Sequence, residues 1–162
     1  MAAFAAAVKI DTIAYLPAQD FGNAYSTFIA QNYGAKQYDR IKKGTRQAFA
    51  ISILFCICIS IVVFFFAKNL MHIFVSPEET EVIAAGISYL RIEGAFYCGI
   101  GCLFLLYGYY RAVCMAEMSV ILTVISLGIR VLLAYLLAAL MHSEIGIWMS
   151  IPIGWVLADI TG

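Results

Sequence analysis

The stretch AFAISILFCICISIVVFFFA (Ala48–Ala67) carries no charged residue over its whole length. A helix needs about 20 predominantly apolar residues to cross the hydrocarbon core of a bilayer, and this stretch is long enough. The rest of the chain is similar: of its 162 residues, 64% are hydrophobic and 12% are charged. A soluble domain is about half apolar and a quarter charged, because it needs a polar surface to stay dissolved. The composition therefore predicts a membrane protein.

Four further membrane spans are predicted around this one. Residues 82–110 and 118–141 are long and apolar, whereas residues 2–33 contain several polar groups and residues 145–160 are short. Polar groups in a span are tolerated where neighbouring helices or a wet cavity cover them. The sequence thus predicts an all-α polytopic membrane protein with a single membrane domain (1–162), a bundle of about five transmembrane helices. Its spans are approximately 2–33, 48–67, 82–110, 118–141 and 145–160.

Loop charge orients these spans. The segment GAKQYDRIKKGTR (34–46) holds five basic residues and the single acid Asp39. Loops rich in Lys and Arg stay on the cytoplasmic side, so we predict a cytoplasmic 34–46 loop in a multi-pass protein of the cell membrane. Alternation of the spans then places the C-terminus inside and Met1 outside. The net charge of the chain is zero, which gives no reason to expect nucleic acid as a partner.

Several polar residues inside the spans are candidates for a functional cavity. A charge at mid-bilayer costs about 2.5–3.5 kcal/mol on insertion scales, so it faces protein or water rather than lipid. In the first span we expect four residues to line a cavity. They are Asp11, Tyr15, Gln19 and Asp20. We expect Glu93 and Arg130, in the third and fourth spans, to form a charge pair. The alternative for all these charges is a salt bridge that merely fixes helix packing.

Other patterns favour structural roles. Gly94, Gly101 and Gly108 recur every seven residues, a spacing that indicates close helix packing more than a hinge. Cys98 and Cys102 share a helix face, but without a nearby His or further Cys we predict no metal site and no cofactor. The sequence has no evident Ser–His or Ser–Lys arrangement, so we predict that the protein is not an enzyme.

Four stretches, taken in order, resemble the second half of the multidrug and toxic compound extrusion (MATE) transporters. They are NAYSTFIAQNYGAKQYDRIKKGTR (Asn23–Arg46), YLRIEGAFYCGIGCLFLLYGYYRAV (Tyr89–Val113), MSVILTVISLGIRVLLAYLLA (Met118–Ala138) and GIWMSIPIGWVLADITG (Gly146–Gly162). The resemblance covers nearly the whole chain, and no single stretch carries it alone.

The resemblance implies a twelve-helix exporter built of two six-helix lobes around a central cavity. In this family, organic cations and drugs leave the cell in exchange for sodium ions or protons. The chain would then supply helices eight to twelve, most of one lobe. Its expected partners are the lipid bilayer, the N-terminal lobe of the same transporter and small organic cations or drugs. The alternative is a truncated structural membrane fragment that does not transport on its own.

The chain departs from the family pattern at two places. Ala112 and Cys114 stand where a turn with glycines is common after the tenth helix. Some members carry a cation-coordinating acid deep in that helix, whereas this chain has apolar or glycine residues around positions 99–101. Glu93 lies about two turns earlier and is not its equivalent, which leaves sodium and proton both open as the coupling ion.

Overall fold

The chain folds as a bundle of long helices. The computed structural model describes residues 2–141 and 144–162, with side chains from Ala5 onward. It is 92% helical and has no strand among these residues, which confirms the all-α prediction. The elements are α1 (Ala2–Gly34), α2 (Tyr38–Phe74), α3 (Thr80–Ala95), α4 (Tyr97–Ala112), α5 (Ala116–Thr123), the π-helix η1 (Val124–Ile129), α6 (Arg130–Met141) and α7 (Glu144–Thr161).

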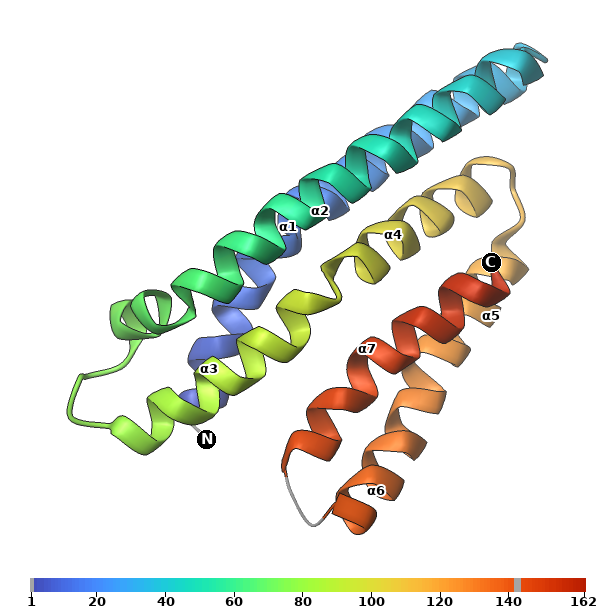
Figure 1. Ribbon diagram of the computed structural model, residues 1–162. Helices are drawn as coiled ribbons and strands as arrows, with labels where there is room; N and C mark the ends of the chain where they lie inside the picture. Colours follow the sequence, from blue (N-terminus) through green and yellow to red (C-terminus); the bar gives the residue numbers. More distant parts are fainter. Residues whose placement is uncertain (1, 142–143) are drawn as a thin grey trace.

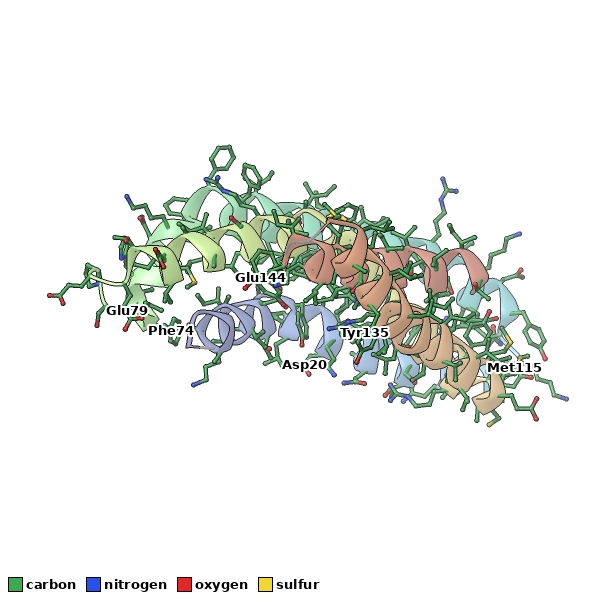
Figure 2. The ribbon with its side chains drawn as sticks, turned by 90° about the horizontal axis from the view of Figure 1, so that it is seen from below. Asp20, Phe74, Glu79, Met115, Tyr135 and Glu144 are labelled. Carbon is green, nitrogen blue, oxygen red and sulfur yellow. The ribbon has the colours of Figure 1, made fainter. Side chains whose placement is uncertain are left out.

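These elements form elongated rods that run alternately up and down the bundle (Figure 1). The α3–α4 rod lies between the α1–α2 pair on one side and the α5–α6 and α7 pair on the other. Figure 2 shows Phe74 and Glu79 at one end of the bundle and Met115 at the opposite end. The C-terminus lies beside the end of α4, where the Tyr110 hydroxyl donates a hydrogen bond of 2.7 Å to the Gly162 carbonyl oxygen.

Among the described residues, two uninterrupted helical segments are long and apolar enough to cross a membrane. They are Tyr38–Phe74 and Ala116–Met141. The α3–α4 pair adds a third if the bent pair counts as one span. The more polar α1 and the shorter α7 do not meet this measure of length and composition, so their crossing stays a prediction that rests on packing against the other helices.

The basic segment 34–46 is not a loop, and in this respect the prediction was wrong. The connection consists of residues 35–37, where Lys36 adopts a left-handed backbone with φ of 54°, and α2 begins at Tyr38. The helix starts this early because Ile41 is already buried in a small apolar cluster with Tyr25 and Ile29 of α1. With 37 residues, α2 is roughly 55 Å long and exceeds a hydrocarbon core of about 30 Å. A helix of this length therefore extends beyond the apolar layer at one end or at both.

The predicted span 82–110 is not one straight helix. It breaks at Phe96, and α3 and α4 meet at an angle of 53°. At the break the Phe96 amide donates to the Glu93 carbonyl, and the Gly99 amide donates to the Phe96 carbonyl, both three residues back instead of four. The span 118–141 also departs from a regular helix, because η1 inserts a π-helical segment between α5 and α6. Such π segments are rare in helices and frequent at functional sites.

Close contacts at glycines hold the rods together. A Cβ added to Gly108 would lie 2.6 Å from the Gly22 carbonyl oxygen, so the backbones of α4 and α1 touch there. Added Cβ atoms on Gly94 and Gly101 would crowd side chains of α2, namely Val63 and Cys56. These contacts confirm the prediction that the glycines at seven-residue spacing serve close packing.

Candidate functional site

Asp11 is a buried carboxyl group inside the bundle. Its side chain is 5% exposed. The Tyr97 hydroxyl donates to Asp11 Oδ1 at 2.7 Å, and the Tyr89 hydroxyl donates to Oδ2 at 3.5 Å. Tyr89 belongs to α3 and Tyr97 opens α4, so the donors stand on either side of the break at Phe96. The bent span thus surrounds a carboxyl of α1 with hydroxyl groups from both of its segments.

Glu93 is a second buried acid beside the same break. Its side chain is 0% exposed, and neither carboxyl oxygen has a hydrogen-bond partner among the described residues. It lies four residues before Tyr97, whose hydroxyl donates to Asp11. An unpaired buried carboxylate is strongly unfavourable. Its charge must therefore be neutralised by a proton or a cation, or the surrounding side chains must move to pair with it.

Arg130 supplies a positive charge to the buried cluster formed by Asp11, Glu93, Tyr89 and Tyr97. It opens α6 directly after the π-helix, is half-buried, and interacts electrostatically with both Asp11 and Glu93. It makes no hydrogen bond to Glu93, since both oxygens of that carboxyl lack a partner. The structure shows no hydrogen bond between the two side chains, and the predicted charge pair of Glu93 and Arg130 stays a prediction.

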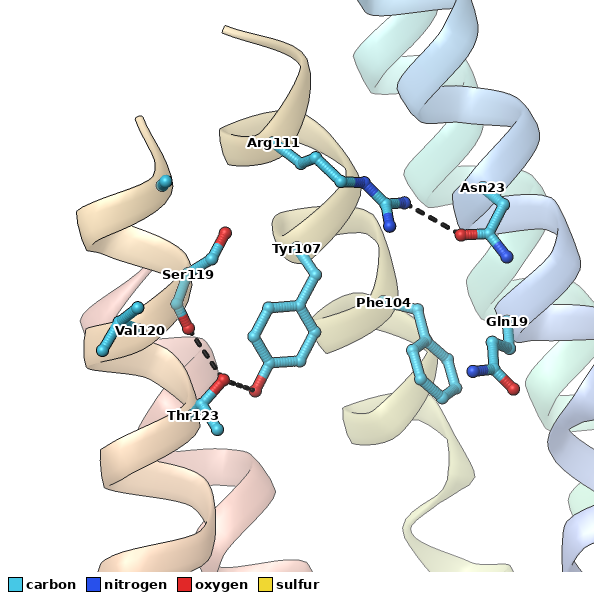
Figure 3. A pocket seen from close by; sticks show the side chains of 9 residues that line it. Gln19, Asn23, Phe104, Tyr107, Arg111, Ser119, Val120 and Thr123 are labelled. Atoms are coloured by element: carbon cyan, nitrogen blue, oxygen red, sulfur yellow. Dashed lines mark hydrogen bonds between the residues drawn. The ribbon is translucent and has the colours of Figure 1, made fainter. Parts of the chain in front are cut away.

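A pocket of about 650 Å³ lies between α1, α4 and α5, on the side of the bundle where α4 ends (Figure 3). It is lined by Gln19, Asn23, Phe104, Tyr107, Arg111, Ala116, Ser119, Val120 and Thr123. Arg111 Nη2 donates to Asn23 Oδ1 at 2.8 Å and links α4 to α1. On the opposite wall, Thr123 Oγ1 lies 3.4 Å from the Tyr107 hydroxyl and donates to the Ser119 carbonyl oxygen at 2.8 Å.

The cavity-lining candidates of the first span fall in different places. Asp11 belongs to the buried cluster, and Gln19 lines the pocket. Tyr15 is half-buried between the two and packs on Phe104, with ring centroids 6.0 Å apart. Asp20 is exposed and is not among the residues that line the pocket. A role for Tyr15 and Asp20 in lining a transport cavity stays a prediction.

Sequence reasoning missed important members of both groups. Tyr97 carries the shortest hydrogen bond to Asp11, and its one signal was a spacing of four residues from Glu93, which places both on one helix face. Arg111 was not among the predicted site residues, yet it belongs to the last turn of α4 and lines the pocket. Among the described residues no three His, Cys, Asp or Glu side chains gather into a group that could hold a metal ion.

Comparison with known sequences gives consistent matches. The sequence model of the MatE family matches residues 1–136. "Probable multidrug resistance protein YoeA" of Bacillus subtilis strain 168 is 25% identical over 166 residues, covering 97% of this chain and 34% of YoeA. "Probable multidrug resistance protein YpnP" of the same organism is 30% identical over 143 residues, covering 88% of this chain and 31% of YpnP. The chain therefore spans about a third of the length of these relatives.

Solved structures match over almost the entire chain. A crystal structure of MATE in complex with MaL6 superposes with a TM-score of 0.88 at 22% identity, covering 99% of this chain and 36% of that one. An outward-facing multidrug resistance MATE family transporter of the MOP superfamily gives a TM-score of 0.87, again at 22% identity with 99% and 36% covered. At this level of identity the match shows the fold.

Proposed function

The chain belongs to the MatE family, and from this premise we propose that it forms part of a secondary active antiporter that exports drugs or organic cations in exchange for sodium ions or protons. The multidrug substrate class comes from the names of the two relatives. The observation that carries the ion-coupled mechanism is the pair of buried acids, Asp11 and Glu93, in a bundle that spans a membrane.

Two carboxyls in this arrangement can bind and release one monovalent cation. Asp11 already accepts a hydrogen bond from Tyr97, whereas Glu93 has both oxygens unpartnered and adjoins a helix break. Broken membrane helices present backbone groups and side chains to coupling ions near the bilayer midplane. Loading the site compensates the buried negative charge, and unloading restores it, so occupancy favours one packing of the rods over another.

A face of α1 requires cover from further protein. Its exposed polar side chains are Gln19, Asp20, Asn23, Thr27 and Gln31. Hydrocarbon is a poor environment for such groups, and water or protein a good one. We propose that a second lobe of the same transporter packs over this face and encloses the transport cavity. The chain by itself would then bind ions without completing transport.

We further propose that the protein resides in the cell membrane with its basic end in the cytoplasm. Lys36, Arg40, Lys42, Lys43 and Arg46 gather at the start of α2, at the end of the bundle that also holds the end of α4 and the C-terminus. The acids Glu78, Glu79 and Glu81 gather at the opposite end. This separation follows the distribution of basic residues in membrane proteins, and it supports the predicted orientation.

The test is gradient-driven export by the transporter that contains this chain, reconstituted in proteoliposomes. A fluorescent organic cation is loaded, and a sodium or proton gradient is imposed separately. We expect Asp11→Asn and Glu93→Gln to abolish the response to the gradient while the protein still inserts and folds. Asp39→Asn, an exposed acid in the first turn of α2, is the matched control. Full gradient-driven export in both buried variants would reject the proposed coupling role.

A further inference from the structure

The pocket between α1, α4 and α5 has an unusual charge for an exporter of organic cations. Of the described residues that line it, Arg111 alone is charged. The nearest acids along the chain, Asp20 and Glu117, are exposed and do not line it. A positive guanidinium in a partly enclosed pocket repels cations and attracts anions.

The walls of the pocket are rich in hydrogen-bond donors. A guanidinium carries five N–H groups, and Arg111 uses one of them on Asn23 Oδ1. Because Asn23 accepts through its oxygen, its amide nitrogen keeps both donors. On the facing wall Ser119 Oγ is buried without a hydrogen-bond partner among the described residues. Figure 3 shows Arg111 and Asn23 on one side of the pocket and Ser119 and Thr123 across from them.

The same pocket has apolar surface next to these donors. Phe104 lies beneath Arg111 on α4, and Val120 of α5, which is 60% exposed, also belongs to the lining. Arg binds phosphate and carboxylate through paired N–H groups, and the aromatic ring and the valine suit a hydrocarbon tail. The pocket thus combines an anion-binding end with an apolar wall.

We propose that this pocket binds the anionic group, a phosphate or a carboxylate, of a small amphipathic molecule. Arg111, Asn23 and Ser119 hold the anionic group, and Phe104 and Val120 contact the apolar part. This site is distinct from the cluster around Asp11, and its occupation requires no ion gradient. Gln19 and Asn23 of its wall also belong to the α1 face that the proposed second lobe covers. The binding test measures affinity for an anion without any gradient, so its failure is distinguishable from a loss of gradient-driven export.

The test is equilibrium binding to the transporter that contains this chain, in nanodiscs of phosphatidylcholine. Hexyl phosphate is the probe, hexyltrimethylammonium is its counterpart of opposite charge, and inorganic phosphate lacks the tail. We expect saturable binding of hexyl phosphate that is at least tenfold tighter than that of either comparison molecule. Equal or tighter binding of hexyltrimethylammonium overturns the charge assignment, and equal binding of inorganic phosphate overturns the amphipathic assignment.

Variants locate the binding. Arg111→Gln is expected to weaken hexyl phosphate at least tenfold, since it removes the one positive charge of the lining. Arg91→Gln is the matched control, because Arg91 is exposed on α3 and stacks over Phe64 at 5.2 Å, away from the pocket. Arg111→Gln also removes the bond to Asn23. Val120→Glu is therefore a second variant, which leaves that bond intact and should weaken binding equally. Unchanged affinity in a folded Val120→Glu protein overturns the proposal.

A competition arm identifies the source of the anion. If the natural occupant is a membrane lipid, phosphatidylglycerol in the nanodiscs competes with hexyl phosphate and reduces its binding to the wild type. The Arg91→Gln protein should show the same reduction. If the occupant is a soluble amphiphile, phosphatidylglycerol has no effect and hexyl phosphate binds as it does in phosphatidylcholine. Both results support the anionic chemistry and differ in its origin.

Discussion

Substitution of Gly108 by alanine tests the contact that fixes α4 against α1. The added Cβ would lie 2.6 Å from the Gly22 carbonyl oxygen, whereas ordinary contacts begin at 3.4 Å. The distance is therefore about 0.8 Å too short (3.4 − 2.6). The added Cβ meets a backbone oxygen, which cannot rotate away as a side chain could. Overpacking of this kind costs about 1–3 kcal/mol. Alanine recovers about 0.5–1 kcal/mol of helix propensity. The midpoints of these two ranges leave a net loss of about 1 kcal/mol in the free energy of unfolding, with an upper limit of about 2.5 kcal/mol.

The assay is reversible unfolding in mixed micelles, followed by circular dichroism as the denaturing detergent fraction rises. Gly34→Ala is the control, because a Cβ at Gly34 would meet nothing within 4 Å. Gly22→Ala should also destabilise, since its Cβ would lie 2.9 Å from the Phe104 carbonyl oxygen. The two losses should be less than additive, because separating α1 from α4 once relieves both contacts. A Gly108→Ala protein as stable as Gly34→Ala would refute the close crossing.

Three further predictions test the buried cluster and the orientation. Tyr97→Phe removes the 2.7 Å hydrogen bond to Asp11 and should cost about 0.5–2 kcal/mol, as measured by the same unfolding assay. The loss should shrink in an Asp11→Asn background, and an undiminished loss would show that the bond contributes nothing. Glu93→Met should raise the free energy of unfolding by about 1–3 kcal/mol, because both oxygens of that carboxyl are buried without partners; a drop in stability would contradict this account. Cys114 is exposed in the connection after α4, so a membrane-impermeant maleimide should label it in inside-out vesicles and not in intact cells. Labelling in intact cells would reverse the proposed orientation.

Much of the helical layout could be predicted from the sequence. The charge-free run 48–67 lies within the long helix α2, and the predicted span 118–141 corresponds to the segment Ala116–Met141. Both runs lie in long helical segments because the signal is local: a long run of apolar residues has no other stable state in a bilayer. The 34–46 segment was wrongly predicted to be a loop. Its basic residues indicate on which side of the membrane it lies, but they do not indicate whether it is helical.

The irregular places in the helices could not be predicted in the same way. The break at Phe96 and the π-helix Val124–Ile129 occur in sequences without proline. Both depend on how the neighbouring rods pack. A local pattern of residues does not contain that information, because several backbone geometries satisfy the same hydrophobic run.

The sequence by itself determined that this is a helical membrane bundle with charge separated between its ends, and that Asp11, Glu93 and Arg130 are ionisable groups within its predicted spans. Those properties follow from composition and from the cost of charge in an apolar layer. The tertiary structure alone decided that Tyr97, 86 residues along the chain, donates to Asp11, and that Arg111 turns into a pocket beside Asn23. Which side chains meet across two helices depends on their relative register and crossing distance. In this bundle backbone contacts such as that of Gly22 with Gly108 fix both.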